Sequence, residues 1–402
     1  MISPNFSLLI KPAGPDCNAR CAYCFYAVAA EQFARGPHRL TVYVLRTVTR
    51  KMLRLGLPVS QFCWQGGEPT LMGLEWFQQA VNFQMQFGRS GQSVANALQT
   101  NGLLIDEAWA AFLVRYKFLV GVSLDGPAAL HDVYRGGGTH ARVMRAVGAL
   151  RTAGVEFNIL SVVNRANEGR GREVYRWLRD QGFDFLQFIP AVETDEHGRP
   201  RDFAPTPEGY GRFMCEVFDA WVEEGGPGKV YVRLFESVLS RLAGAPAGNC
   251  IMDKRCDHYL VVEHNGDVFP CDFFVRPDMR IGNIGESDLP ELAAAAGATA
   301  FAAAKGVWPR ECDACRFLSL CHGGCLKDRE RAGGTFSSKA YLCPSYQIFY
   351  NHTYEWFART AARVAARIAR PSPPQPAAPG GRNAACPCGS GKKLKECRGK
   401  VR

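Results

Sequence analysis

The chain has 402 residues, 47% of them hydrophobic, which is enough for one large domain and a smaller one. It begins with no basic segment followed by an apolar run, and its alanine-rich stretch 292–304 is short and weakly apolar, so we expect neither a signal peptide nor a membrane span. The formal net charge of +10 comes from basic residues scattered along Arg-rich helical patterns, which is typical of a solvated surface, so we expect no specific nucleic acid partner.

The chain contains sixteen cysteines and no recognisable export signal. This combination favours a reducing compartment, where clustered thiols bind metal more often than they pair as disulfides. We therefore expect the protein to act in the cytoplasm. Cys63 and Cys215 stand apart from the clustered thiols, on a predicted strand and in a helical pattern, and both are most simply buried apolar residues.

A compact set of three thiols follows the first predicted strand. Its members are Cys17, Cys21 and Cys24. With CxxxCxxC spacing they can bind three corners of an iron–sulfur cluster and leave one iron open to an exogenous ligand. A zinc site would need a fourth ligand close by, and His38 is distant in the sequence. With Tyr23 before the third cysteine, the motif resembles that of the radical S-adenosylmethionine (SAM) enzymes, whose [4Fe-4S] cluster chelates SAM through the fourth iron.

Short β-rich runs alternate with amphipathic segments as far as residue 193. The predicted strands are 6–11, 59–64, 94–100, 118–124, 155–163 and 183–189, and the predicted helices include 41–55, 74–87, 106–116 and 142–152. Each helical segment is long enough to connect two parallel strands. The sequence therefore predicts an α/β fold in which six parallel strands form a partial (β/α)6 barrel.

Turn-forming and polar residues follow each of the six strands. The loops are the cysteine loop and residues 65–69, 99–102, 123–126, 163–164 and 189–192. Any one of them could be an ordinary turn, because Gly, Asn, Asp and Pro are turn formers. Since ligands bind at the carboxyl ends of parallel strands, their joint position behind the cysteine set predicts one site.

The run Gly66-Gly67-Glu68-Pro69 has a use beyond turning, because glycines let the backbone approach a ligand and a carboxylate can receive an ammonium group. In the radical SAM enzymes that the chain resembles, such a run binds the methionyl amino group of SAM. We expect Ser123 to offer its hydroxyl to the methionyl or ribose end, and the backbone at Val192 to meet the adenine. Arg135 is a candidate partner for the SAM carboxylate, although an arginine is more often a surface charge.

A second cysteine-rich region supplies enough thiols for two four-ligand sites. Its cysteines are Cys250, Cys256, Cys271, Cys312, Cys315, Cys321, Cys325 and Cys343. The sequence alone does not pair them, and their spacing in isolation also fits two structural zinc sites. Their order resembles the SPASM extension of peptide-modifying radical SAM enzymes, which has two auxiliary [4Fe-4S] clusters. That resemblance implies one set of Cys250, Cys256, Cys271 and Cys325, and another of Cys312, Cys315, Cys321 and Cys343.

Residues 261–271 are predicted as a β-hairpin, because Asn265-Gly266 is a strong turn signal. The hairpin delivers Cys271 together with Asp272. A carboxylate beside a cluster thiolate has a like charge nearby and little solvent around it, and both are expected to raise its pKa. A raised pKa suits Asp272 as a proton acceptor. Alternatively, Asp272 caps a backbone amide in a turn.

The composition changes after Arg370 to a run rich in Pro, Ala and Gly, which predicts a semi-rigid linker. We expect a barrel at 1–235, an auxiliary-cluster domain at 236–365, the linker at 366–380 and a tail at 381–402. The tail resembles the SEC-C zinc motif and has cysteines at 386, 388 and 397. That motif usually ends in Cys-Cys or Cys-His, whereas Arg398 follows Cys397, so the tail is a degenerate candidate zinc site.

Four features together resemble the anaerobic sulfatase-maturating enzyme family. They are residues 17–26, 65–69 and 123–126 and the Cys271-Asp272 pair in the SPASM order. The resemblance implies oxidation of a Cys or Ser of a sulfatase polypeptide to Cα-formylglycine, with SAM and three [4Fe-4S] clusters as cofactors and an electron donor such as flavodoxin or ferredoxin. In that family an auxiliary cluster takes the electron that leaves the substrate radical. By this resemblance, Asp272 would accept the proton of the target thiol or hydroxyl.

Two other functions stay open at this point. One is a SPASM peptide maturase that forms a thioether or carbon–carbon crosslink in a ribosomal peptide, although no segment of the sequence resembles a leader-binding domain. The other is a non-catalytic zinc-binding adaptor, which would not need the Gly-Gly-Glu-Pro run at a strand end. Neither the partner sulfatase nor the choice of Cys or Ser follows from the sequence.

Overall fold

The computed structural model describes residues 3–33, 35–195, 197–330, 334–368 and 392–393. The expected linker beyond residue 368 and nearly all of the candidate zinc tail lie outside these residues. Among the helices described, none combines the length and the apolar character that crossing a bilayer would require.

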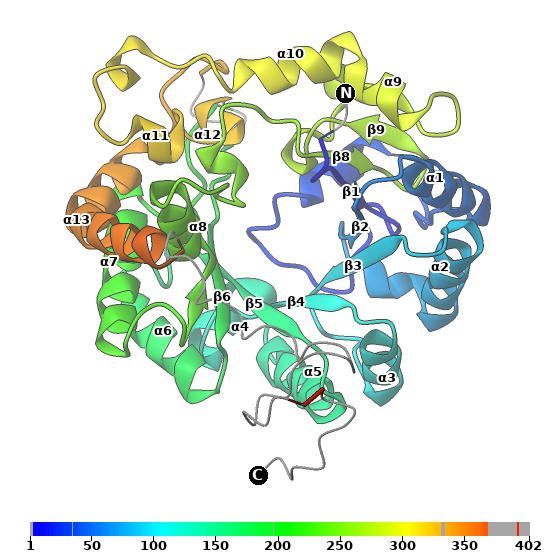
Figure 1. Ribbon diagram of the computed structural model, residues 1–402, viewed down its shortest axis with the longest axis horizontal. Helices are drawn as coiled ribbons and strands as arrows, with labels where there is room; N and C mark the ends of the chain where they lie inside the picture. Colours follow the sequence, from blue (N-terminus) through cyan, green and yellow to red (C-terminus); the bar gives the residue numbers. More distant parts are fainter. Residues whose placement is uncertain (1–2, 34, 196, 331–333, 369–391, 394–402) are drawn as a thin grey trace.

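All six predicted parallel strands are present, in chain order across one sheet. They are β1 (Ser7–Ile10), β2 (Val59–Trp64), β3 (Ser93–Thr100), β4 (Leu119–Ser123), β5 (Phe157–Val163) and β6 (Phe185–Pro190). The helices between them lie outside the curved sheet (Figure 1): α1 (Val42–Arg54), α2 (Leu74–Phe87), α3 (Glu107–Arg115), α4 (Ala128–Arg135), α5 (Thr139–Ala153) and α6 (Gly171–Asp180). The prediction of a partial (β/α)6 barrel is confirmed.

Local signals explain where these helices begin and end. Thr41 and Asp106 accept hydrogen bonds from the Val44 and Trp109 amides and thereby cap α1 and α3. Gly154 ends α5 in the left-handed conformation, with φ of 74°. The boundaries therefore depend on short-range chemistry, which is why they lie close to those predicted.

The sheet is larger than predicted, with ten strands among the described residues. Its additional members are β7 (Tyr231–Val232), β8 (Tyr259–Val262), β9 (Asp267–Phe269) and β10 (Gly282–Asn283), in the order β10-β9-β8-β1-β2-β3-β4-β5-β6-β7. The predicted hairpin is β8 and β9, which pair antiparallel, and Gly266 in its turn has φ of 86°. β8 pairs in parallel with β1, so that Ser7 lies opposite Tyr259 and Ile10 opposite Val262. The hairpin therefore extends the barrel sheet directly.

The remaining elements surround the cysteine-rich part. The helices are α7 (Pro207–Glu223), α8 (Arg233–Leu242), α9 (Leu289–Ala294), α10 (Ala296–Ala304), α11 (Leu318–Cys321), α12 (Leu326–Glu330) and α13 (Cys343–Ile368). Short 3-10 helices occur at Ala27–Gln32, Pro69–Met72, Cys250–Met252, Asp272–Phe274, Pro277–Met279 and Arg310–Cys312. α9 and α10 cover the alanine-rich stretch, which forms two short helices.

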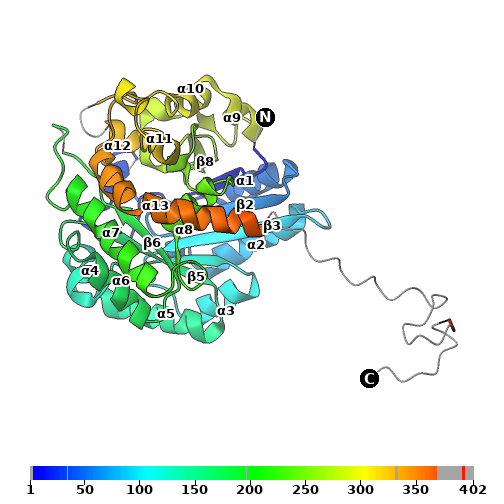
Figure 2. The same cartoon turned by 60° about the vertical axis from the view of Figure 1, so that its left-hand side comes forward.

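Helix α13 connects the cysteine-rich part to the barrel, because it begins at Cys343 and packs against α7 and α8 (Figure 2). Phe357 on α13 is fully buried. The centroid of its ring lies 5.2 Å from that of Phe218 on α7 and 5.9 Å from that of Phe235 on α8. The predicted domains on either side of residue 235 therefore share one aromatic core as well as one sheet.

Replacement of Phe357 by Ala should lower the free energy of unfolding by about 3–5 kcal/mol, because it leaves a cavity in this shared core. Urea denaturation followed by circular dichroism measures the change. Val364→Ala is the control, because Val364 lies on the same helix with 40% of its surface exposed, and it should change the free energy by less than about 0.5 kcal/mol. Equal, small effects of both changes would show that α13 contributes little to the core.

Candidate active site

The first cysteine set lies in the loop between β1 and α1. The Cys24 amide donates to the Cys21 carbonyl at 3.1 Å, and the Ala19 amide lies 3.4 Å from the Cys17 sulfur. Burial raises the pKa of Cys21, and the neighbouring Cys24 and Asp125 charges raise it further against the lowering effect of Arg135. Thiols of this kind become thiolates when a metal binds them. The donor set therefore fits an iron–sulfur group.

The loop after β2 packs directly against the cysteine loop. The Gly67 amide donates to the Gly14 carbonyl at 2.8 Å, and the Glu68 amide donates to the Asp16 carbonyl at 2.8 Å. A Cβ atom on Gly67 would lie 2.0 Å from the Asp16 carbonyl oxygen, and Gly66 has φ of 129°. The two glycines are thus required for contact between the two loops, a structural role that the sequence did not indicate.

Glu68 is fully buried and bonded on both carboxylate oxygens. Oε1 accepts from the Thr70 amide at 3.0 Å, the Thr70 hydroxyl at 2.6 Å and the Thr100 hydroxyl at 2.8 Å. Oε2 accepts from the Asn101 amide at 2.7 Å. The carboxylate therefore joins the end of β2 to the end of β3. Its predicted contact with a ligand ammonium stays a prediction, and that ammonium would have to share Oε2 with Asn101.

Arg135 has a carboxylate partner within the chain. Its Nε and Nη2 lie 3.0 and 3.1 Å from the two oxygens of Asp125, which is fully buried. The Tyr23 hydroxyl also donates to Asp125, and the Arg135 guanidinium lies 5.3 Å from the centroid of the Tyr23 ring. This triad joins the cysteine loop, the end of β4 and α4. A contact between Arg135 and a ligand carboxylate stays a prediction.

Ser123 lies at the carboxyl end of β4, and Val192 lies just beyond the end of β6, as the sequence predicted. The Ser123 hydroxyl accepts from the Gln99 side chain at 3.2 Å. Val192 is buried, and its amide donates to the Pro190 carbonyl at 3.1 Å. Asp125 was seen in the sequence only as part of a turn, because nothing local marks it as the partner of Arg135.

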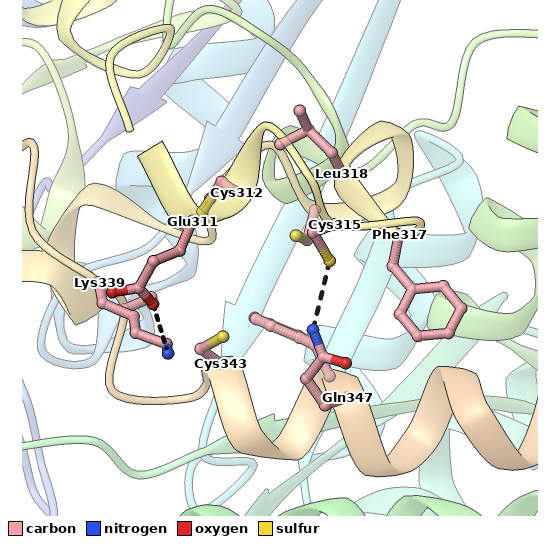
Figure 3. Close-up of a pocket in the computed structure, with 12 residues that line it drawn as sticks. Glu311, Cys312, Cys315, Phe317, Leu318, Lys339, Cys343 and Gln347 are labelled. Carbon is pink, nitrogen blue, oxygen red and sulfur yellow. Dashed lines mark hydrogen bonds and ion pairs between the residues drawn. The ribbon is translucent and has the colours of Figure 1, made fainter. Parts of the chain in front are cut away.

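Four of the auxiliary thiols line one cavity of about 110 Å³. They are Cys312, Cys315, Cys321 and Cys343, the set implied for one auxiliary cluster (Figure 3). The Gln347 side chain donates to the Cys315 sulfur at 3.3 Å, and Lys339 pairs with Glu311 at 2.9 Å at the rim. Thiols around a single cavity are the ligands that an iron–sulfur cluster requires.

The other four thiols also come together. Cys256 and Cys271 pack against the side chains of one small apolar cluster that contains Phe274. Burial raises the pKa of Cys256, Cys325 and Cys271. The charge of Cys250 raises the pKa of Cys256 and of Cys325 further. The charge of Cys325 in turn raises the pKa of Cys271. These mutual effects place Cys250, Cys256, Cys271 and Cys325 in one electrostatic group.

Asp272 lies beside the second of these groups, 3.5 Å from the Cys271 sulfur, and interacts electrostatically with a buried lysine that the sequence did not reveal. It is 8% exposed and accepts from the Tyr259 hydroxyl at 2.8 Å. Lys11, fully buried, has its Nζ 3.4 Å from the centroid of the Tyr26 ring. Burial lowers the pKa of Lys11, whereas the charges of Asp272 and Glu263 raise it. The periodicity of β1 predicted only a strand end here.

The cysteine loop and the Asp272 segment are in direct contact. Phe25 follows Cys24 and Phe273 follows Asp272, and the centroids of their rings are 4.7 Å apart. The first cysteine set and the candidate base therefore belong to one site, although about 250 residues separate them in the sequence.

Comparisons with known proteins agree with this arrangement. The family model described as the radical SAM superfamily matches residues 12–178, that of the SPASM iron–sulfur cluster-binding domain matches 250–316, and that of the SEC-C motif matches 382–397. A cysteine-type anaerobic sulfatase-maturating enzyme of Clostridium perfringens is 35% identical over 87% of this chain and 97% of its own length. A serine-type enzyme of Bacteroides thetaiotaomicron is 33% identical over 86% of this chain and 88% of its own length. The chain belongs to the anaerobic sulfatase-maturating enzyme family.

Solved structures agree with this family assignment. A structure of anSMEcpe with bound AdoMet superposes with a TM-score of 0.83, at 34% identity over 89% of this chain and 99% of that chain. A structure of Streptococcus suis SuiB with its precursor peptide has a TM-score of 0.61 at 15% identity, a likeness of fold alone. As a radical SAM enzyme with a SPASM domain, this sulfatase-maturating enzyme uses SAM and [4Fe-4S] clusters, and three clusters match its eleven clustered thiols.

Replacement of Gly67 by Ala should displace the loop before Cys17, because the added methyl group would overlap the Asp16 backbone. We expect anaerobically reconstituted protein to lose about four of about twelve iron atoms, those of the first cluster, and to lose SAM binding. Iron and sulfide analysis with equilibrium SAM binding measures both. Gly137→Ala is the matched control, because no atom lies within 4 Å of its added Cβ. Full iron and normal SAM binding in Gly67→Ala would contradict the loop contact.

Proposed function

We propose that this protein oxidises a Cys or Ser residue of a sulfatase polypeptide to Cα-formylglycine. The observation that supports it best is the contact between Phe25 and Phe273, because it places the first cysteine set beside Asp272. Relatives of both the cysteine type and the serine type have similar identity to the chain, so the target residue can be either. The crosslinking and adaptor alternatives have weaker support, since the relatives at 35% and 33% identity described above are sulfatase-maturating enzymes.

When bound, the cofactors would supply the oxidation: SAM on the first cluster would provide the radical that takes a hydrogen atom from Cβ of the target, and an auxiliary cluster would take the remaining electron. A Ser target then gives the aldehyde directly, whereas a Cys target gives a thioaldehyde that water hydrolyses to the aldehyde with release of hydrogen sulfide. Cys17, Cys21 and Cys24 would bind the first cluster, and the two groups of four thiols would bind the auxiliary clusters. The backbone of Gly66 and Gly67, Glu68, Ser123, Arg135 and Val192 would bind SAM.

The chain's own task beyond binding is to remove a proton and exclude water. Asp272 would accept the proton of the target thiol or hydroxyl, because its side chain is almost buried and lies 3.5 Å from the Cys271 sulfur, next to a group of auxiliary thiols. The rings of Phe25, Tyr26 and Phe273 pack between the cysteine loop and Asp272. Apolar rings at this position would keep water from the substrate radical.

The enzyme needs an electron to begin each reaction, and a small carrier such as flavodoxin or ferredoxin is the proposed donor. Thirteen free cysteines among the described residues are consistent with a reducing compartment, so we place the reaction in the cytoplasm.

The tail matches the SEC-C motif but lacks the usual last ligand, so we propose that any zinc there has no part in the oxidation.

Replacement of Asp272 by Asn should leave SAM cleavage intact but slow aldehyde formation on a sulfatase-motif peptide by about 10²–10⁴-fold, because Asn has the same shape and cannot accept the proton. An aldehyde-reactive label counts the product, and 5′-deoxyadenosine counts SAM cleavage. Asp278→Asn is the matched control, since Asp278 lies in the same segment with an exposed side chain.

The same measurements distinguish failure of the residue's role from failure of the function. Normal aldehyde formation by fully cluster-loaded Asp272→Asn would remove Asp272 from the mechanism. An unmodified or crosslinked peptide from wild-type enzyme, with SAM cleaved, would contradict sulfatase maturation and favour a peptide maturase.

Truncation after Arg370 should leave the rate of aldehyde formation unchanged within about twofold, because a Pro-rich segment separates the tail from the catalytic part. The comparison uses full-length and truncated enzyme with equal iron content. A large loss of rate in the truncated enzyme would assign the tail a part in the reaction.

A further inference from the structure

Two buried cations lie between the two groups of auxiliary thiols. Lys305 follows α10 and is 1% exposed, and Arg329 on α12 is fully buried. We call them the cation pair. Both interact electrostatically with thiols of each group, Lys305 with Cys256, Cys325 and Cys321, and Arg329 with the same three and with Cys312. Neither residue was a candidate from sequence, where a lone Lys or Arg is indistinguishable from a surface charge.

The Lys305 ammonium is surrounded by backbone carbonyls. Its Nζ lies 2.7 Å from the Gly324 oxygen, 3.0 Å from that of His322, and 3.2 Å from those of Ile251 and Cys321. Each of these four groups is an acceptor only, so the nitrogen acts as a donor throughout, as an ammonium does.

The Arg329 guanidinium has the same kind of surroundings. It donates to the carbonyls of His322 at 2.6 Å, Phe336 at 2.8 Å, Gly323 at 3.0 Å and Lys305 at 3.1 Å, and to that of Val307. All these acceptors are neutral. Within the part of the chain that the structure describes, no ion pair joins a carboxylate to either member of the cation pair.

Three of these carbonyl groups come from one strained loop, His322-Gly323-Gly324. Its three residues have φ of 42°, 76° and 82°, so the backbone is left-handed throughout, including at the non-glycine His322. The loop joins Cys321, in one thiol group, to Cys325, in the other. Gly323 also lines the cavity of Cys312, Cys315, Cys321 and Cys343. The cation pair therefore contacts the segment that links the two cluster sites.

Two like charges buried together without a carboxylate are unfavourable unless another anion balances them. An iron–sulfur cluster with four thiolate ligands is such an anion, and charge and hydrogen bonding around a cluster set its reduction potential. We propose that Lys305 and Arg329 offset the negative charge of the auxiliary clusters and raise their reduction potentials, so that these clusters accept the electron from the substrate. This proposal rests on the proposed function for the electron's origin.

Replacement of Lys305 by Met tests the proposal, because Met has similar length and no charge. Reduction adds negative charge to a cluster, so loss of a nearby cation should favour the oxidised form. In anaerobically reconstituted full-length enzyme, EPR-monitored redox titration should show auxiliary midpoint potentials lower by about 59 mV or more, a tenfold change in a one-electron equilibrium. The potential of the first cluster should not change, and Lys305→Arg should keep the wild-type auxiliary potentials.

Lys339→Met is the matched control. Lys339 also lies near Cys343 and Cys312, but its side chain is 55% exposed and paired with Glu311 (Figure 3). Water and its partner screen this charge, so its removal should shift the auxiliary potentials much less than Lys305→Met does.

The titration reads the clusters directly, so its result does not depend on whether the peptide product is an aldehyde. Unchanged auxiliary potentials in iron-replete Lys305→Met, or a shift equal to that of Lys339→Met, would overturn the proposal. If Lys305→Met does not retain iron, Lys305→Gln replaces it and the same downward shift is expected. Loss of iron from both neutral variants with retention in Lys305→Arg would also support the charge role, whereas loss from all three would overturn it.

Discussion

The arrangement of this enzyme depends on the pairing of β8 with β1. Hydrogen bonds between two four-residue strands, Tyr259–Val262 and Ser7–Ile10, join the cysteine-rich region to the first strand of the barrel. β1 leads into the loop of the first cysteine set, and the hairpin that begins with β8 leads to Cys271 and Asp272. One stretch of sheet therefore fixes the distance between the cysteines proposed to bind the SAM cluster and the candidate base, which independent domains joined by a linker could not do.

Buried charges are the second common feature of the site, and they are balanced in two ways. Arg135 and Asp125 neutralise each other and, with Tyr23, orient the cysteine loop. Among the described residues, Lys305 and Arg329 donate to backbone carbonyls, and in our proposal the sulfur-bound clusters balance their charge. The first arrangement is complete in the polypeptide, whereas the second requires the cofactors. We therefore expect the geometry around Arg135 and Asp125 to depend less on bound iron than the geometry around Lys305 and Arg329 does.

Sequence reasoning predicted the barrel well because its signals are local. Alternating hydrophobic periods, turn residues and helix caps lie within a few residues of one another, and all six strands were found within about two residues of their bounds. The cysteines were equally visible, since thiols at CxxxCxxC spacing have few other uses. The family resemblance then supplied the grouping of the eight auxiliary thiols, which spacing alone left open between clusters and zinc.

Other features were decided only by the tertiary structure. Lys11, Asp125, Lys305 and Arg329 look like ordinary charged residues in the sequence, because the partners that define them lie on other segments. The glycines of residues 66–67 were expected to approach a ligand, but they also allow contact with the backbone at Gly14 and Asp16. Periodicity and spacing therefore determined the elements and the candidate metal-binding thiols. Burial and the pairing of charges depended on which distant segments meet, and a single sequence does not encode that in any local pattern.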